Sequence, residues 1–475
     1  MPAGLPAGRV GEDTPVTQAP MTRRTFLGMA AGAAGVAGAS LAGCSAAKSS
    51  SATTMVPRRP TAATPGHVGL PPNPSAPVGS DQLPQFDHLV VVMMENHSFD
   101  NAIGVLGRGD GFTIAADGSP TATNPDGHGG LVHAFAMPTP CQLPNQPTQT
   151  WNASHQQYDD GTNEGFVVSA SGPVAMGYFT AKDLPFSYSL AGTFPIADRW
   201  FCSVLAQTFP NRRYLLAGTS LGLIDDSLLM TLPPNGTILQ QLERHGISWR
   251  DYSSNVPGIG VWPGLLSQPA MTRGIVSIES FFRDCAAGTL PSCSFVDPNF
   301  STTSEENPQD VQFGDAFLAK VVNAVMAGPK WSKTLLIWTY DEHGGYFDHV
   351  PPPSAPEPDE VPPALVAGDV PGSFNRFGFR VPSGVVSPFA KEDFVSHTVY
   401  DHTSILKLIE TKWNLPALTR RDAAANSPLD MVDFDAPPAF AHPPRLSAPA
   451  NPAREDSCEV LGPGSIPPPG AVTGP

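Results

Sequence analysis

Several features that mark other protein classes are missing from this chain of 475 residues. No CxxC pair occurs, so a structural zinc site is not expected. There is no run of basic residues and the formal net charge is −16, which argues against nucleic acid as a partner. We interpret the acidity as a contribution to solubility. With 41% hydrophobic residues, the chain has ample material for a large core.

The first 44 residues resemble a bacterial export signal. The pair Arg23-Arg24 leads into a Gly/Ala-rich apolar run that is too short to span a membrane and ends at Cys44. The paired arginines resemble a twin-arginine signal. The final Leu-Ala-Gly-Cys resembles a lipobox, in which Cys44 becomes the lipidated first residue of a membrane-anchored protein. An ordinary cleaved signal, giving a secreted protein, is the alternative. Translation starts at Met1 or Met21.

The remaining chain divides by composition. Residues 45–84 are rich in Ser, Thr, Pro and Ala and predict a disordered tether. Residues 435–475 are proline-rich and predict a disordered tail. No internal repeat is visible between them, so residues 85–434 are expected to form one catalytic domain.

Two apolar stretches in that domain run directly into polar residues. Leu89–Met94 is followed by Glu95 and Asn96, and Thr334–Tyr340 by the acids at 341 and 342, each pair preceding a histidine. Such uniformly apolar runs are typical of strands buried on both faces of a parallel sheet. Ligands bind at the carboxyl ends of strands in such sheets. The sequence therefore predicts one metal site between the two strand ends.

The predicted donors are oxygen atoms of Glu95, Asn96, Asp341 and Glu342. Oxygen ligands favour calcium, magnesium or manganese, and zinc also accepts carboxylates. Acids after strands are often only loop or cap residues. The occurrence of two matching stretches favours the metal site.

A third stretch, Thr208 to Leu215, places a hydroxyl before Pro210 and an amphipathic run. This pattern predicts a helix start, where backbone amides favour anions, and Arg212 is expected to bind the same anion. A threonine that only caps the helix is the alternative.

Other segments predict the surrounding architecture. Asp310–Val325 and Thr403–Trp413 have helical spacing, and residues 381–387 have the composition of a core strand. Strands that alternate with helices indicate a wound α/β sheet. Because an exported protein meets an oxidising compartment, we also expect a short-loop disulfide between Cys285 and Cys293.

Four motifs taken together resemble the bacterial phosphoesterase family of phospholipases C and acid phosphatases, in the alkaline-phosphatase-like superfamily. They are Glu-Asn-His-Ser-Phe-Asp from residue 95, Thr-Phe-Pro-Asn-Arg-Arg-Tyr-Leu from 208, Tyr-Asp-Glu-His-Gly-Gly-Tyr-Phe-Asp-His-Val-Pro-Pro-Pro from 340 and Tyr-Asp-His-Thr-Ser-Ile-Leu from 400. The resemblance runs from about residue 86 to 422. It implies a wound sheet with helices on both faces.

The resemblance also implies residue roles. The divalent metal is held by Glu95, Asn96, Asp341, Glu342 and the nucleophile Thr208. The metal lowers the pKa of the threonine hydroxyl, and a phosphothreonine forms and is hydrolysed. His155 and His402 match histidines near the phosphate.

One position departs from the family pattern. Many members carry a histidine before a proline where this chain has Asn307. An asparagine can still hydrogen-bond a phosphoryl oxygen, but it cannot deliver a proton at neutral pH. Leaving-group protonation then falls to His155, His402 or His343. The last of these is alternatively a residue that only orients its neighbour.

The expected activity is phospholipid cleavage of the phospholipase C type. Because the long phospholipases C of the family carry extra C-terminal β domains that this sequence does not show, hydrolysis of phosphomonoesters is the close alternative. The segment from Thr208 to Arg212 also aligns with a sulfatase signature, but a threonine cannot give the formylglycine that sulfatases use. A solute-binding lipoprotein is the non-enzymatic alternative. The oligomeric state is not indicated by the sequence.

Overall fold

The computed structural model describes residues 68–141 and 147–450. The expected export signal, Cys44 and residues 45–67 of the expected tether lie outside the described residues. So do residues 451–475 of the expected tail. Among the described helices, none is long and apolar enough to cross a bilayer.

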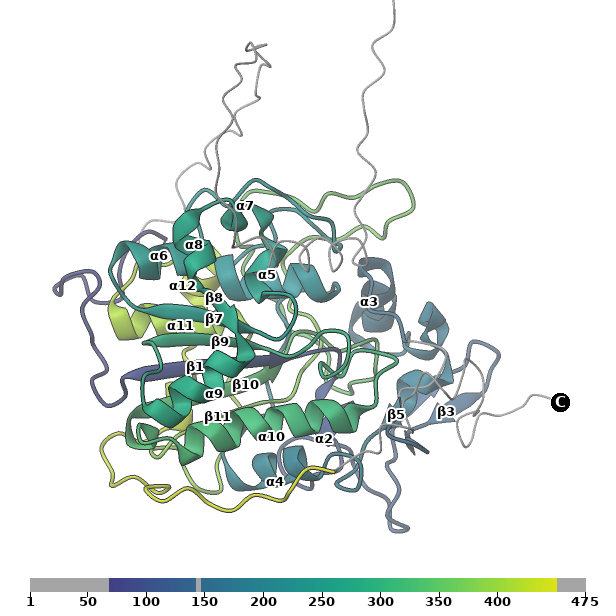
Figure 1. Ribbon diagram of the computed structural model, residues 1–475. Coiled ribbons are helices and arrows are strands. Elements are labelled where there is room, and N and C mark those ends of the chain that lie inside the picture. The colour runs from purple at the N-terminus through teal and green to yellow at the C-terminus, as the bar shows by residue number, and fades with distance from the viewer. Residues whose placement is uncertain (1–67, 142–146, 451–475) are drawn as a thin grey trace, which may run out of the picture.

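An eight-stranded sheet forms the centre of the domain (Figure 1). The strands in spatial order are β12 (Val395–Ser396), β6 (Ile196–Ala197), β11 (Ser383–Val386), β10 (Thr334–Tyr340), β1 (His88–Met94), β9 (Cys293–Asp297), β7 (Trp249–Ser253) and β8 (Ile275–Ser277). From β10 to β8 all neighbours pair in parallel, whereas β11 runs antiparallel to β10 and β6. The sheet is therefore mixed, with a parallel centre.

The two strands expected to carry the site lie side by side. β1 pairs with β10 in parallel from His88 opposite Thr334 to Met94 opposite Tyr340. Every residue of β10, and all of β1 after its first residue, is buried, which explains the uniformly apolar runs. Because the last residues of the two strands are in register, the polar residues that follow emerge together at one edge.

Helices cover both faces of the sheet, as the resemblance implied. On one face α10 (Val311–Ala327) packs against α9 (Ile278–Ala287) and α4 (Pro185–Thr193). On the other face α5 (Thr208–Ala217) packs against α11 (Thr403–Trp413) and α6 (Ile238–Arg244) (Figure 1). The predicted α/β class is confirmed.

The remaining elements are short. The helices are α2 (Phe99–Ile103), α3 (Trp151–Tyr158), α7 (Pro263–Leu266), α8 (Pro269–Gly274) and α12 (Arg420–Ala424). Two small sheets pair β2 (Thr123–Pro125) with β3 (Leu131–His133) and β4 (Phe135–Ala136) with β5 (Gly177–Tyr178). Single tight turns of helix occur at Asp159–Gly161, Val167–Ser171, Pro173–Met176, Gly258–Val261, Trp331–Lys333 and Pro428–Met431.

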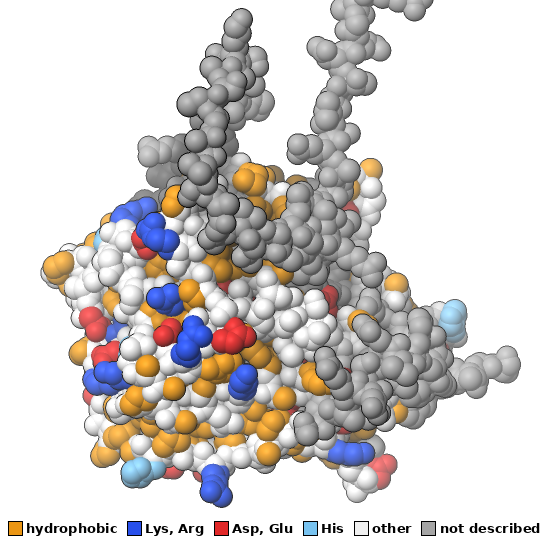
Figure 2. All heavy atoms as spheres, in the orientation of Figure 1, with side chains coloured by type: hydrophobic (Ala, Val, Ile, Leu, Met, Phe, Trp, Pro, Cys, Tyr) orange, Lys and Arg blue, Asp and Glu red, His pale blue; other side chains and the backbone are white. Residues whose placement is uncertain are grey.

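The outward surface of α9 and α10 carries charges of both signs. Glu279 and Arg283 are exposed on α9, and Lys320 is exposed on α10. The Lys320 ammonium lies 4.2 Å from the centre of the Phe282 ring. Figure 2 shows basic and acidic side chains intermixed on this face of the molecule. Mixed surface charge of this kind supports solubility.

The sequence placed the two long helices well. α10 begins after Asp310, whose carboxylate accepts a hydrogen bond from the amide of Gln312 as an N-cap. α11 has the expected bounds; its N-cap residue is His402, and the Asp401 carboxylate accepts from the Thr403 hydroxyl. The strand expected at residues 381–387 is the shorter β11.

The expected disulfide between Cys285 and Cys293 is wrong. Both residues are free and buried, Cys285 on α9 and Cys293 at the start of β9. Burial raises the pKa of the Cys285 thiol to about 12. The two cysteines fill the core between helix and sheet, and Cys141 is instead the disulfide-bonded cysteine of the described chain.

The packed domain extends beyond residues 85–434 at both ends. The Asn414 side chain donates to the carbonyls of Asn73 and Ala76, each at 2.9 Å. At the other end the Trp331 indole donates to the carbonyl of Phe440 at 2.9 Å, and Phe440 is buried. Residues 68–84 and 435–450 therefore contact the domain, although their composition predicted disorder. Composition did not reveal these contacts, because single hydrogen bonds to backbone carbonyls produce no periodic pattern of hydrophobic residues in the sequence.

A close backbone approach joins the ends of β1 and β10. Gly344 has a φ of +65°, and a Cβ there would lie 2.0 Å from the carbonyl oxygen of Asn96. We predict that Gly344→Ala lowers the free energy of unfolding by more than about 3 kcal/mol, since a backbone clash adds to the left-handed conformational cost. Gly69→Ala is the control, because Gly69 has a φ of +77° but nothing within 4 Å. It should lose only about 1–2 kcal/mol. Equal losses in denaturant titrations would contradict the close approach.

Candidate active site

The site begins where β1 and β10 end. The amide of Asp341 donates to the carbonyl of Met94 at 3.1 Å, and the amide of Asn96 donates to Asp341 Oδ1 at 3.1 Å. Asn96 has a φ of 67°, a left-handed conformation that asparagine tolerates better than most residues. This turn directs residues 95 and 96 toward the end of the neighbouring strand. Glu95, Asn96 and Asp341 are all buried.

Glu342 continues the acidic cluster. Its amide donates to Asp341 Oδ1 at 2.8 Å, and its own Oε2 accepts from the amide of Gly344 at 2.7 Å. Burial is the main cause that raises the pKa of Glu342 well above its usual range, and the negative charge of Asp341 raises it further. Two adjacent carboxylates held in this way are poised for a cation.

Thr208 is the first residue of α5, and its hydroxyl is buried without a hydrogen-bond partner. The turn before it is fixed by Asn211, whose side chain accepts from the amide of Val204 at 3.0 Å and donates to the carbonyl of Ala206 at 2.7 Å. The local sequence therefore forms a rigid turn that delivers a hydroxyl at the helix start. Thr208 is not a helix cap, which was the alternative interpretation.

The start of α5 offers fewer donors to an anion than expected. The amide of Phe209 donates to Asp226 Oδ1 at 2.8 Å, and Pro210 has no N–H group. After burial and the charge of Asp341, the charge of Asp226 also contributes to raising the pKa of Glu342. The hydroxyl of Thr208, more than the helix amides, is the group that this turn presents.

Arg212, one helical turn after Thr208, has different contacts from those expected. Its Nε donates to Asp341 Oδ2 at 3.1 Å, Nη1 to Asp297 Oδ1 at 3.0 Å, and Nη2 to the carbonyls of Met93 and Met94 at 3.3 Å each. Its Nε also lies 3.6 Å from Glu95 Oε1. With these donors engaged and only 4% of the side chain exposed, Arg212 orients the acids and is not available as the expected phosphate ligand.

The balance of charge and unused oxygens fits a divalent cation. One guanidinium contacts three buried carboxylates, those of Glu95, Asp297 and Asp341, and Glu342 adds a fourth acid. Buried charge without a counter-charge is strongly unfavourable. The cluster also contains buried oxygens that have no hydrogen-bond partner, namely Asn96 Oδ1, Thr208 Oγ1 and Glu342 Oε1. These are hard oxygen donors of the kind that calcium, magnesium and manganese prefer.

The two buried histidines do not offset the negative charge. Burial lowers the pKa of His343 to about 3, and burial is also the main cause that lowers the pKa of His402 to about 4. His343 Nε2 lies 2.7 Å from Gln157 Oε1, while Nδ1 lies 3.4 Å from Glu342 Oε2. His343 therefore lies beside the acid next to it, and its Nδ1 makes no hydrogen bond there. His402 donates from Nε2 to the carbonyl of Asp341 at 2.6 Å, which leaves its buried Nδ1 without a partner.

The other two predicted residues, His155 and Asn307, are hydrogen-bonded to residues outside the acidic cluster. His155 on α3 donates from Nδ1 to the carbonyl of Trp151 at 2.8 Å and is half-buried, which lowers its pKa. The same helix carries Gln157, the partner of His343. The hydroxyl of Tyr346, in the loop that follows β10, donates to the side-chain carbonyl of Asn307 at 2.9 Å. Its carbonyl oxygen is thus engaged with protein.

A second ion-pair network lies behind the cluster and was not predicted. Arg380 donates from Nη2 to Asp100 Oδ1 at 3.0 Å and from Nε to Asp348 Oδ1 at 2.8 Å. His349 Nδ1 lies 2.7 Å from Asp100 Oδ2, and this contact raises the pKa of His349 although burial opposes the rise. One ligand atom each from Asp100, Asp348 and His349 lie within 4.8 Å of one another, close enough for a metal.

We interpret this second group as an ion-pair network, because the guanidinium of Arg380 already binds both carboxylates. It ties the segment after β1 to the segment after β10. The sequence contained a signal, since Asp100 and Asp348 each follow one of the two strand-end motifs by a few residues. The partner arginine, at position 380, had no signal. Asp297, which binds Arg212, was missed for the same reason.

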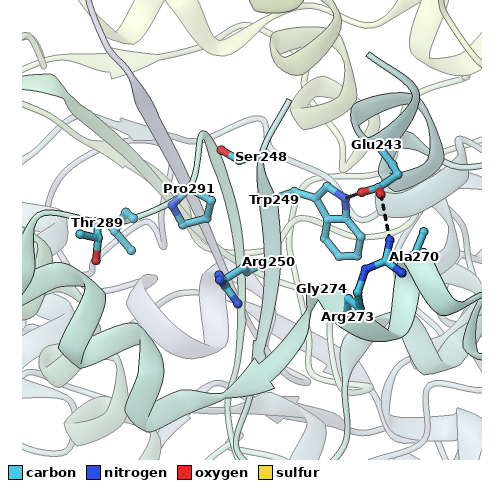
Figure 3. Close-up of a pocket in the computed structure, with 10 residues that line it drawn as sticks. Glu243, Ser248, Trp249, Arg250, Ala270, Arg273, Gly274, Thr289 and Pro291 are labelled. Atoms are coloured by element: carbon cyan, nitrogen blue, oxygen red, sulfur yellow. Dashed lines mark hydrogen bonds and ion pairs between the residues drawn. The ribbon is translucent and has the colours of Figure 1, made fainter. Parts of the chain in front are cut away.

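A surface cavity of about 350 Å³ lies at the opposite edge of the sheet (Figure 3). Trp249, which lines it, is the first residue of β7, and Pro291 lies just before β9. Its Glu243 pairs with Arg273 at 3.6 Å and accepts from the Trp249 indole at 3.3 Å. None of the predicted site residues lines this cavity.

The contacts of Arg212 predict an altered link between metal and stability. Arg212→Met leaves the buried acids without their guanidinium, so the metal-free protein should lose about 3–5 kcal/mol of unfolding free energy. Added divalent metal should then stabilise this variant more than wild type, since metal binds only the folded acids. Thermal unfolding with and without magnesium, calcium, manganese or zinc measures both effects.

Arg213→Met is the matched control for that comparison. Arg213 is equally buried but donates to the backbone carbonyls of Val261, Asp225 and Ser227. It should lose stability without a change in the metal response. If the two variants respond alike to metal, the carboxylates near Arg212 do not form the metal site.

Comparison with known proteins agrees with the expected family. The Phosphoesterase family model matches residues 86–416. Phospholipase C B of Mycobacterium tuberculosis is 31% identical over 427 residues, covering 77% of this chain and 82% of that protein. Non-specific phospholipase C4 of Arabidopsis thaliana is 30% identical, covering 74% and 72%. Non-hemolytic phospholipase C of Pseudomonas aeruginosa is 27% identical, covering 83% and 60%.

Solved structures align only at low TM-scores. An alkaline phosphatase superfamily protein of Vibrio parahaemolyticus aligns with a TM-score of 0.37 and 11% identity, covering 74% of this chain and 71% of that one. A phosphonate monoester hydrolase of Agrobacterium radiobacter aligns with a TM-score of 0.35 and 10% identity, covering 74% and 78%. Such scores carry no argument, so the assignment depends on the sequence matches. From these matches, the chain belongs to the Phosphoesterase family and is a phosphoric ester hydrolase.

Proposed function

We propose that this chain is a metal-dependent phospholipase C that cleaves phospholipid phosphodiesters through a phosphothreonine. The observation that carries the proposal is the buried, unpartnered hydroxyl of Thr208 at the start of α5. It lies one turn from Arg212, which binds the acids of both strand ends. The names of the relatives, all phospholipases C, support a phospholipid as the substrate class.

The proposed mechanism starts from the geometry of Thr208. A divalent cation held by Glu95, Asn96, Asp341 and Glu342 would lower the pKa of the hydroxyl and offset charge on the phosphoryl oxygens. Thr208 Oγ1 then forms a bond to phosphorus while the bond from phosphorus to the alcohol oxygen breaks. The rigid turn at residues 204–211 holds the hydroxyl in place, so little rearrangement is needed during attack.

Proton movements are assigned from the unused ring nitrogens. His402 Nδ1 is buried with no partner, and in this tautomer it accepts the proton that leaves the Thr208 hydroxyl. His155 donates its Nδ1 hydrogen to the Trp151 carbonyl, so its Nε2 is the nitrogen that takes up a proton from solvent and gives that proton to the departing alcohol oxygen. His155 is also the more exposed of the two and can exchange protons with solvent. Water then hydrolyses the phosphothreonine.

A substrate panel tests the function. Full-length protein loaded with each metal in turn is assayed on phosphatidylcholine, a glycerophosphodiester, nitrophenyl phosphate and nitrophenyl sulfate. The proposal expects the highest kcat/KM on phosphatidylcholine and no turnover of the sulfate. A higher kcat/KM on nitrophenyl phosphate would contradict the phospholipase C proposal and would favour a phosphomonoesterase. Phosphate binding without any turnover would indicate a solute-binding protein.

Thr208 should form the covalent intermediate. Thr208→Val keeps the side-chain shape but removes the oxygen, so we expect turnover to fall by a factor of roughly 10³ or more. Metal content should largely persist, and Thr208→Ser should retain part of the rate. Acid quench of wild-type enzyme during turnover, followed by peptide mass analysis, should locate phosphate on the peptide that contains Thr208.

Thr193→Val is the control for that substitution. Its hydroxyl donates only to the carbonyl of Ser189 within α4, so the same chemical change should leave turnover unaltered. If Thr208→Val also turns over near the wild-type rate, the nucleophile lies elsewhere.

We also propose that the protein is exported and anchored by a lipid on Cys44. The support is the paired arginines, the apolar run and the lipobox pattern. Cys44→Ser should move the protein from the membrane fraction to the soluble fraction, with activity intact, because the acylated residue lies far from the catalytic domain in sequence. An unchanged membrane fraction in cell fractionation would contradict the anchor.

A further inference from the structure

One loop of the domain exposes apolar side chains beside the candidate active site. We call residues 361–372 the apolar loop. Leu365 is 38% exposed, Val366 72% and Val370 36%, and these are three of the nine large hydrophobic residues that are exposed in the described chain. In Figure 1 this segment is part of the green loop that projects from the body beyond α3. Exposed apolar side chains gathered in one short segment are a sign of an interaction surface.

The apolar loop has a defined conformation. The amide of Ala364 donates to the carbonyl of Gly222 at 2.8 Å, which holds the first half of the loop. The amide of Val370 donates to Asn152 Oδ1 at 2.8 Å, and the Trp151 indole donates to the carbonyl of Val370 at 2.9 Å. Both ends are therefore fastened to the domain, and the tip between them projects as a unit.

The single charged residue of the loop is turned toward the protein. Asp369 Oδ2 accepts from the amide of Val366 at 2.8 Å, and Oδ1 accepts from the Asn152 side chain at 3.2 Å. These bonds hold the carboxylate against α3 and the loop's own backbone. The tip, residues 364–368, has the sequence Ala-Leu-Val-Ala-Gly and presents no charge.

The apolar loop also touches the candidate active site. A Cβ at Gly372 would lie 2.7 Å from Nε2 of His155 and 2.8 Å from the Trp151 ring, so the loop backbone lies directly on these two side chains. The same helix places Gln156 against the carbonyl of Val168, a residue that is itself 40% exposed. Apolar side chains thus lie on the exposed side of α3, which carries the predicted proton donor.

We propose that the apolar loop inserts into the surface of a zwitterionic lipid membrane and brings the active site to its phospholipid substrate. This inference rests on the proposed function. Charge decides the kind of membrane: the segment that leads into the loop exposes Glu357 and also Glu360, which pairs with Arg420, and the whole chain carries −16. An anionic surface would be repelled by these acids, whereas a phosphatidylcholine surface has no net charge. Leu365 and Val366 supply apolar area that favours transfer from water into the membrane.

Vesicle binding tests the loop separately from catalysis. All proteins are full-length and carry Cys44→Ser, which removes any acyl anchor. The variant Leu365→Ser/Val366→Ser is compared with Val78→Ser, which removes another exposed apolar side chain, 41% exposed, beside the end of α6. Co-sedimentation with phosphatidylcholine vesicles and with phosphatidylglycerol vesicles measures binding in the presence of a chelator, so that no lipid is cleaved.

We expect the double variant to bind phosphatidylcholine vesicles about tenfold less tightly than wild type, because two apolar side chains no longer leave water on binding. Its kcat/KM on the water-soluble ester nitrophenylphosphorylcholine should be unchanged, and Val78→Ser should behave as wild type in both assays. Wild-type binding should be weaker on phosphatidylglycerol. Unchanged vesicle binding by the double variant, or stronger binding to the anionic vesicles, overturns the proposal.

Two further outcomes separate this inference from its alternatives. A wild-type dimer that becomes monomeric in the double variant by analytical ultracentrifugation would show that a second copy covers the loop, which overturns it. If the protein binds vesicles through the loop but hydrolyses only phosphomonoesters, the membrane surface stands and the phospholipase C function fails. If the protein hydrolyses phospholipid but the double variant binds vesicles as tightly as wild type, the phospholipase C function stands and the membrane role of the apolar loop fails.

Discussion

The structure of the site depends on negative charge that the protein itself leaves in excess. Arg212 contacts three buried carboxylates, and a fourth acid follows in sequence. A guanidinium in this position does two things that a metal cannot do alone. It keeps the acids folded inward before a cation binds, and its planar donor geometry fixes the direction of each carboxylate. Because the buried carboxylates repel one another, binding of a divalent cation among them would be favourable.

The second arginine network extends the same logic outward. Arg380 joins Asp100 to Asp348, and these residues follow the two strand ends that carry the candidate metal ligands. The segments after β1 and β10 are therefore linked twice, at the acids of the site and again a few residues later. Loops fastened at two points have less freedom to move than loops fastened at one. The ligands of the cluster gain their position from both links.

Much of this could be predicted from the sequence, and the reason differs from residue to residue. Buried parallel strands have uniformly apolar sequences, so β1 and β10 and the acids after them were identifiable from Leu89–Met94 and Thr334–Tyr340. Thr208 was identifiable because the Thr-x-Pro-x-Arg spacing marks a helix start. The family resemblance then related these three segments to one another, which periodicity cannot do.

The errors have a common physical cause. The role of Arg212 was misjudged because a sequence shows which donors exist but not which acceptors fold around them, and Asp297 and the Met93 and Met94 carbonyls engage that side chain. The pairing of Cys285 with Cys293 failed because short spacing says nothing about a helix and a strand that separate the thiols in the core. Arg380 gave no signal, since its partners Asp348 and Asp100 lie 32 and 280 residues away along the chain and come beside it only in the fold.

The distribution of the candidate ligands along the chain has a consequence for any metal that this site binds. The contact between Arg212 and Asp341 spans 129 residues, and that between Arg212 and the Met93 carbonyl spans 119. No short fragment of the chain contains the donor set, so an unfolded or partly synthesised chain has no comparable affinity for the ion. The free energy of metal binding is then available only to the complete fold. A metal bound at the ends of β1 and β10 would add to the stability of that strand pair, and its occupancy would report whether distant parts of the polypeptide have come together.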